Sequence, residues 1–117
     1  MKLFAALKSI RELQRDQIPF VKSILDFDII IEIGFAEEEG QPLTLKQLFL
    51  LNIGSRTTVR RRLVRLSDAG VVIRRKKKND QRSTILAVAP VSRKHLTQYG
   101  SQLAGIWHQT GLADLGG

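Results

Sequence analysis

Residues 44–89, TLKQLFLLNIGSRTTVRRRLVRLSDAGVVIRRKKKNDQRSTILAVA, decide the fold because two helix signals, a turn and two strand signals follow one another closely. Thr44 and Gln47 have the spacing of a capping box, in which an N-cap threonine and a glutamine three residues later cap a helix reciprocally. This spacing predicts a short helix over about 45–51. A tight turn is expected at 52–54, since asparagine and glycine tolerate a left-handed backbone.

A second helix is predicted from about Ser55 to Ala69, and Gly70 is placed to cap its C-terminus. Val59, Leu63 and Leu66 recur at helical spacing and form a stripe that would face the core. The first turns of this helix are short and polar. Two helices joined by such a tight turn form a helix-turn-helix, in which the start of the second helix is presented outward.

The segments VVIRR (71–75) and TILAVA (84–89) have the composition of β-strands, so 71–89 is predicted to form a hairpin around a basic loop. A helix over about 19–36, with Pro19 in its first turn, is expected to be buried on more than one side. Further helices are expected at 2–15 and 91–109. The sequence therefore predicts a winged helix-turn-helix, mainly α with a small antiparallel β-hairpin, as one domain over 1–117 with a flexible tail at 110–117.

The net charge of +8 is concentrated in one quarter of the chain. Residues 54–82 contain 11 of the 19 lysines and arginines but only two acids, Asp68 and Asp80, and so carry +9. The other 88 residues contain eight bases and nine acids, a net of −1. Concentrated like charge repels itself, which indicates a polyanionic partner. A solvated basic face is the alternative, but the density of arginine on one helix favours double-stranded DNA.

Thr57 and Arg61 are the candidate base-reading residues because they lie on the outer face of helix 55–69. In a helix-turn-helix the first residues of the second helix reach base edges in the major groove. Arginine can bind guanine through two hydrogen bonds, and a threonine methyl can contact thymine. The other candidates for DNA contact on this helix are Ser55, which would meet a phosphate, and Arg56, Thr58, Arg60 and Arg65.

Residues 42–90 resemble the winged-helix core of MarR-type transcriptional regulators. The resemblance rests on the threonine-capped helix, on the segment LVRLSDAGVVIR at 63–74, and on the sequence Asp80-Gln81-Arg82 between the strands. It implies that Arg82 enters the minor groove and that Asp80 holds this arginine in place. Narrow A·T-rich minor grooves do attract arginine. Asp80 is alternatively a turn former, and both roles can coexist.

The remaining basic residues of the hairpin are expected to bind the DNA backbone. Lys76, Lys77 and Lys78 would contact phosphates and add salt-dependent affinity without sequence information.

The sequence gives no indication of an enzyme. No Ser/His/Asp pattern or glycine-rich phosphate loop is present, so we expect no catalytic residues and no cofactor. His95 and His108, 13 residues apart on one predicted helix, would lie on different sides of it, and no metal site is expected. The acids at 37–39 are interpreted as solvated loop charges.

A cytoplasmic location without membrane insertion is expected. Cysteine is absent, which fits a reducing compartment. The most apolar run, 27–35, is too short to span a bilayer, and no signal-peptide pattern is recognisable.

Helices at both ends of the chain are expected to form a homodimer. Helices 1–36 and 91–109 would supply the interface, which pairs the stripe Leu3, Leu7, Ile10 and Leu13 with Leu103, Ile106 and Trp107. The predicted function is a sequence-specific transcriptional regulator on a palindromic site, with any small-molecule effector left open. The alternative is a winged helix that binds RNA, binds nucleic acid without specificity, or binds another protein.

Overall fold

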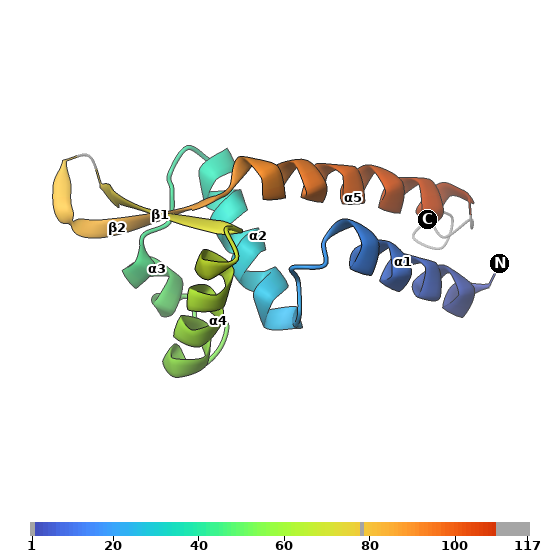
Figure 1. Ribbon diagram of the computed structural model, residues 1–117, viewed down its shortest axis with the longest axis horizontal. Helices are drawn as coiled ribbons and strands as arrows, with labels where there is room; N and C mark the ends of the chain where they lie inside the picture. The colour runs from blue at the N-terminus through green and yellow to red at the C-terminus, as the bar shows by residue number, and fades with distance from the viewer. Residues whose placement is uncertain (1, 78, 110–117) are drawn as a thin grey trace. The chain divides into compact units, whose positions relative to one another are not determined.

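The computed structural model describes residues 2–77 and 79–109, and within them the predicted winged helix-turn-helix is confirmed. The elements follow in the order α1 (Leu3–Gln17), α2 (Ile24–Glu38), α3 (Leu45–Leu50), α4 (Arg56–Asp68), β1 (Val72–Lys77), β2 (Asp80–Val88) and α5 (Pro90–Gln109) (Figure 1). The chain divides into two compact units. One is Lys22–Pro90, and the other contains the described parts of Met1–Val21 and Val91–Gly117.

The helix-turn-helix of the Lys22–Pro90 unit forms through the caps that the sequence predicts. The Thr44 backbone N–H donates to Gln47 Oε1 at 2.9 Å, and the Gln47 N–H donates to Thr44 Oγ1 at 3.1 Å, which completes the capping box of α3. Asn52 takes the left-handed backbone in the turn, with φ of 60°. Gly70 has φ of +76° just beyond α4, where a residue with a side chain would be strained.

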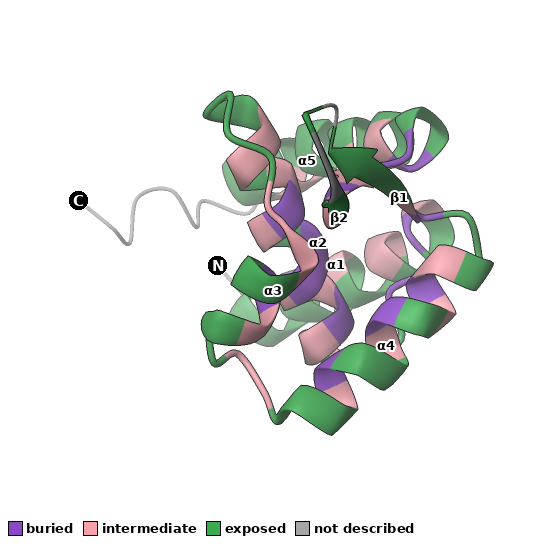
Figure 2. Cartoon of the chain, turned by 90° about the vertical axis from the view of Figure 1, so that its left-hand side faces the viewer, coloured by how far each residue is buried: buried purple, intermediate pink, exposed green. Residues whose placement is uncertain are grey.

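The core of this unit lies where α2, α3 and α4 meet the base of the hairpin. Figure 2 shows buried residues on α2 and α4, and α4 contributes the predicted stripe of Val59, Leu63 and Leu66. The other large buried side chains of this core are Ile29, Ile30, Ile33, Leu48 and Leu86.

The start of α2 differs from the prediction. The helix begins at Ile24, whereas Pro19 lies in a turn that precedes it. The reason is a stronger cap: Ser23 Oγ accepts the Asp26 backbone N–H at 3.1 Å, which satisfies a donor of the first helical turn. The expectation of burial on several sides is also wrong, because Ile24 is 83% exposed and Phe35 is 57% exposed.

The hairpin lies within the predicted range 71–89, but its strands are longer than predicted, because Lys76 and Lys77 belong to β1 and β2 already begins at Asp80. β1 and β2 are antiparallel, and Val72 pairs with Val88 at the base. The segment before α3 also contacts this base. The Leu86 N–H donates to the Leu43 carbonyl at 2.9 Å, and Thr44 forms an isolated antiparallel β-bridge with Ile85. The hairpin is therefore anchored at its base.

The unit of α1 and α5 carries exposed apolar side chains on both helices. On α1, Phe4 is 80% exposed, and Leu3 and Leu7 are also exposed, as is Trp107 on α5. Ile10 and Leu13 of the predicted stripe are half-buried. Burial raises the pKa of Tyr99 on α5, so its phenol stays neutral at physiological pH.

A buried carboxylate joins α2 to α4. Asp26 is fully buried and is the one charged residue in the buried core of the described chain. Its Oδ2 accepts the Lys22 backbone N–H at 2.9 Å and binds the Arg65 guanidinium, and its Oδ1 lies 4.0 Å from Arg62 Nε. A buried charge is costly unless it is paired, so these contacts fix α4 against the start of α2.

We expect Asp26→Ala to lower the free energy of unfolding by about 2–3 kcal/mol. We expect a smaller loss of unfolding free energy than for a fully buried ion pair, because both arginines are about one-third exposed. Denaturant unfolding checks this, with Asp28→Ala on the same helix as the matched control. Equal effects of the two substitutions would contradict a special role for Asp26.

Candidate nucleic-acid interface

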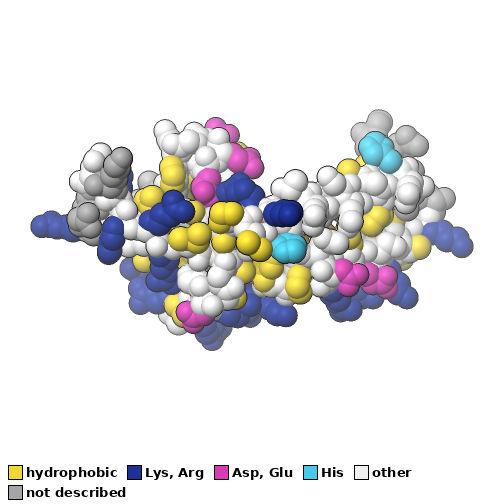
Figure 3. Space-filling model, turned by 45° about the horizontal axis from the view of Figure 1, so that its top comes forward, with side chains coloured by type: hydrophobic (Ala, Val, Ile, Leu, Met, Phe, Trp, Pro, Cys, Tyr) yellow, Lys and Arg dark blue, Asp and Glu magenta, His cyan; other side chains and the backbone are white. Residues whose placement is uncertain are grey.

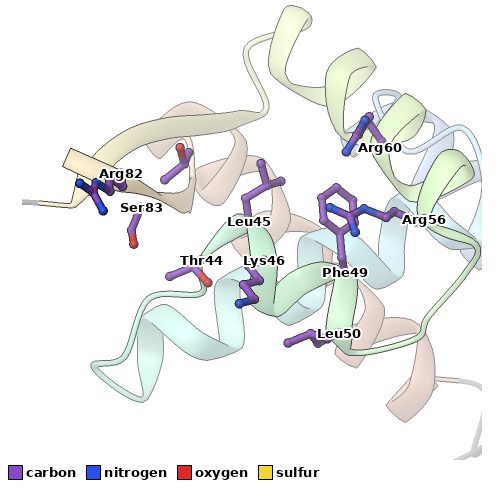
Figure 4. A pocket seen from close by; sticks show the side chains of 10 residues that line it. Thr44, Leu45, Lys46, Phe49, Leu50, Arg56, Arg60, Arg82 and Ser83 are labelled. Atoms are coloured by element: carbon purple, nitrogen blue, oxygen red, sulfur yellow. The ribbon is translucent and has the colours of Figure 1, made fainter. Parts of the chain in front are cut away.

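The start of α4 presents the predicted contact residues in two rows. Arg56 and Arg60, four residues apart, are exposed on the side toward α3, as Figure 4 shows. Thr57 and Arg61 are exposed in the next row round the helix. The structure therefore brings Arg56 and Arg60 together and leaves the two candidate base readers on an open face.

Ser55 is the N-cap of α4, and its hydroxyl is already engaged. Ser55 Oγ accepts the Thr58 backbone N–H at 3.2 Å and donates to Thr58 Oγ1 at 2.8 Å. Its hydroxyl therefore orders the helix start and is not directed only toward solvent. Anion binding near this position would use the backbone N–H groups of the first helical turn.

A groove of about 510 Å³ lies between α3, the first turns of α4 and strand β2 (Figure 4). The apolar residues that line it are Leu45, Phe49 and Leu50. All the charged residues that line it are cationic: Lys46, Arg56, Arg60 and Arg82. Four cations around one groove attract anions more strongly than the same charges spread over a convex surface.

Arg82 lines this groove and lies where the register of the hairpin shifts near its tip. Lys76 pairs with Thr84, but the next residue, Lys77, pairs with Asp80, so Gln81, Arg82 and Ser83 are extra residues on β2. A bulge bends its strand and redirects its side chains. Arg82 is exposed and lines the groove opposite α4.

Phe49 contacts two of the arginines through its ring. The Arg56 Cζ lies 4.9 Å from the ring centroid and the Arg60 Cζ lies 5.5 Å from it. Both distances fall within the range of cation–π contacts. Sequence reasoning missed Phe49 and Lys46. Phe49 could have been noticed, because it is an aromatic residue next to Leu48 on the six-residue helix α3.

Arg65 lies in a different environment from the other candidates. Its guanidinium binds the buried Asp26, and its side chain is about one-third exposed. The structure thus gives Arg65 an internal partner, which separates it from the row of Arg56 and Arg60.

The basic residues of β1 extend the cationic surface along the hairpin. Arg74 Nε–H donates to Ser67 Oγ at 3.2 Å, and Arg75, Lys76 and Lys77 are exposed. Figure 3 shows several basic side chains where the hairpin lies. Lys78 lies outside the described residues, as does the side chain of Asp80, so the predicted pairing of Asp80 with Arg82 stays a prediction.

Glu37 corrects the interpretation of residues 37–39 as solvated charges. Glu37 Oε1 accepts the Val88 backbone N–H at 2.8 Å and so ties the end of α2 to the base of the hairpin. Its neighbours Glu38 and Glu39 are exposed, as predicted.

The comparisons with known proteins support the fold. No protein-family model and no curated protein sequence matches the chain. Solved structures do match, including a transcriptional regulator from Thermotoga maritima (TM-score 0.68, 22% identity, covering 97% of this chain and 75% of that one). MarR matches with a TM-score of 0.60 at 17% identity, covering 96% and 79%. AbsC, a MarR family transcriptional regulator from Streptomyces coelicolor, matches with a TM-score of 0.59 at 16% identity, covering 91% and 71%.

At these identities the likeness establishes the fold: the chain has the winged-helix fold of the MarR family's solved structures. The resemblance inferred from residues 42–90 is confirmed at that level. Within the part of the chain that the structure describes, no cluster of three or more His, Cys, Asp or Glu residues is placed to hold a metal ion. None of the described helices combines the length and apolarity needed to cross a bilayer.

We expect Glu37→Ala to raise the hydrogen-exchange rate of the Val88 amide by about tenfold, because a part-buried N–H loses its acceptor. Exchange measured by NMR checks this. Glu37→Gln, which keeps an acceptor oxygen, should retain most of the protection, and Glu38→Ala should leave it unchanged. Unchanged exchange in Glu37→Ala would contradict an anchoring role.

Proposed function

We propose that this protein is a DNA-binding transcriptional regulator that recognises a specific double-stranded sequence. One observation carries the proposal: the groove between α3, α4 and β2 is lined by four cations drawn from three separate elements. A shape of this kind suits a DNA backbone that passes between a helix in the major groove and a hairpin in the adjacent minor groove. The fold shared with proteins described as transcriptional regulators supports it.

In this proposal the parts of the site have different tasks. Thr57 and Arg61 read base edges from α4, which lies in the major groove. Arg82 enters the minor groove. Lys46, Lys76 and Lys77 bind phosphates, whereas Arg56 and Arg60 lie beside the base-reading residues at the start of α4. The protein acts by binding and not by catalysis, and no cofactor takes part.

The proposal includes a homodimer on a palindromic site. Its support is the apolar surface of α1 and α5, where Phe4 and Trp107 are exposed in the single chain. Large exposed apolar residues of this kind mark interaction sites. Two copies related by a two-fold axis would place their α4 helices about 34 Å apart, one turn of DNA.

Selection from a pool of random double-stranded DNA tests the function directly. The enriched sequence is then competed against random DNA and against structured RNA at one fixed salt concentration. We expect a palindromic motif bound at least 1,000-fold more tightly than random DNA. Equal binding of all three competitors would contradict the proposal and favour a non-specific nucleic-acid-binding module.

Arg61 and Lys77 should separate base reading from phosphate binding. Arg61→Ala is expected to cost about 1–3 kcal/mol on the selected site and much less on random DNA. Lys77→Ala should weaken all DNA about equally and reduce the salt slope by about 1 per protomer. Binding titrations over a series of salt concentrations measure both quantities. Equal losses on both DNAs for Arg61→Ala would show that Arg61 does not read bases.

Arg82→Lys tests the minor-groove assignment at constant charge. We expect weaker binding, with a larger loss on sites that have A·T-rich flanks than on sites with G·C-rich flanks. The reason is that a narrow groove favours the planar, weakly hydrated guanidinium over the strongly hydrated ammonium. Competition between the two flank types provides the measurement. A silent substitution on both would mean that the hairpin binds only phosphates.

Negative charges introduced on the apolar face of α1 should dissociate the proposed dimer into monomers. The double substitution Phe4→Asp/Leu7→Asp is expected to give a monomer at tens of micromolar by light scattering and to weaken binding to a two-half-site DNA. Leu51→Asp, at an exposed apolar residue outside the helices assigned to the interface, is the matched control and should stay dimeric. A wild-type protein that is monomeric at this concentration would rule out the dimer.

A further inference from the structure

We propose that Phe49 is a positioning residue that sets the sequence specificity of α4 by holding Arg56 and Arg60 before DNA arrives. The inference rests on the DNA-binding function proposed above and adds to it a residue that makes no base contact of its own. The observation behind it is one aromatic ring with two guanidinium groups beside it, at 4.9 and 5.5 Å (Figure 4).

The position of Phe49 is fixed from two directions. The capping box between Thr44 and Gln47 sets the start of α3, and the buried Leu48 sets which side of α3 faces the core. With Leu48 directed inward, Phe49 lies half-buried toward the first turns of α4. The turn at Asn52 then brings α4 back beside it.

The ring offsets two unfavourable features of the arginine pair, which are like-charge repulsion and rotamer freedom. Arg56 and Arg60 are four residues apart on one helix face, where like charges repel. Both are exposed, so each would otherwise sample many rotamers. The negative face of an aromatic ring attracts both cations and restricts them. Restricting a side chain before binding removes part of the entropy cost that binding would otherwise incur.

The consequence for specificity follows from geometry. A guanidinium held in one plane can form its paired hydrogen bonds only with an acceptor at a matching place, whereas a mobile one can turn to any phosphate. Phe49 therefore favours the selected DNA over random DNA without adding a charge. Arg61, which lies in the neighbouring row, does not have this ring contact among the described interactions and serves as the internal reference.

The first experiment needs no DNA. Relaxation of the arginine Nε–H groups by NMR should show Arg56 and Arg60 more restricted than Arg61 in the wild type. Phe49→Leu, which keeps apolar bulk but removes the ring, should bring both to the mobility of Arg61, and Phe49→Tyr should keep them restricted. Arg56 and Arg60 as mobile as Arg61 in the wild type would overturn the inference whatever the protein does with DNA.

The second experiment uses the sequence obtained by selection. Phe49→Leu should weaken binding to that sequence by about three- to tenfold, change binding to random DNA by less than twofold, and leave the salt slope unchanged. Phe49→Tyr should restore the preference. Leu51→Ala, at an exposed residue that caps α3 and is outside the residues lining the groove, is the matched control and should change neither affinity.

A double-mutant cycle separates positioning from simple packing. If Phe49 acts through Arg56, then Arg56→Ala should cost less when combined with Phe49→Leu than in the wild type. Additive losses, or equal losses on both DNAs with a lowered unfolding temperature, would mean that Phe49 only supports the helix. A wild-type protein without any sequence preference would contradict the proposed function itself, whereas the relaxation measurement still decides whether the ring holds the arginines.

Discussion

The fully buried carboxylate of Asp26 is the contact on which the cationic face depends. It accepts the backbone N–H of Lys22 just before α2 and binds the guanidinium of Arg65 in the last turn of α4. An unpaired carboxylate in this position would be strongly unfavourable, so the pairing defines one arrangement of the two helices. Arg56, Arg60 and Arg61 on the same helix are exposed and directed away from the core. One acid inside the unit thus helps to arrange the many cations outside it.

The hairpin likewise has a part that is held in place, its base, and a part that carries exposed charges. Its base is held by Glu37 on α2 and by backbone contacts to the chain before α3, whereas its outer part carries exposed cations that repel one another. Such repulsion lowers stability in the free protein and is relieved when a polyanion binds. The register shift beside Arg82, which lines the groove, lies in this outer part. In the proposed function, stability is therefore provided at the base and affinity at the tip.

The sequence predicts those parts that depend on local signals. The capping box at Thr44, the apolar stripe of α4 and the cap at Gly70 each need only a few neighbouring residues, and the structure confirms them. Contacts between distant residues could not be foreseen: the Asp26–Arg65 pair spans 39 positions and the Glu37–Val88 bond spans 51. The start of α2 is predicted at Pro19 because proline suits a first helical turn. The Ser23 cap instead determines where α2 begins.

In the proposed function, each of two copies of the chain contacts DNA through its own groove between α3, α4 and β2. Hydroxyl-radical footprinting on the selected sequence tests it most directly. The account predicts two protected regions about one helical turn apart, flanked by protection in the minor grooves where Arg82 would lie, and Arg82→Lys should weaken the flanking protection alone. Uniform protection along the DNA, or one protected region bound by a single copy, would contradict it.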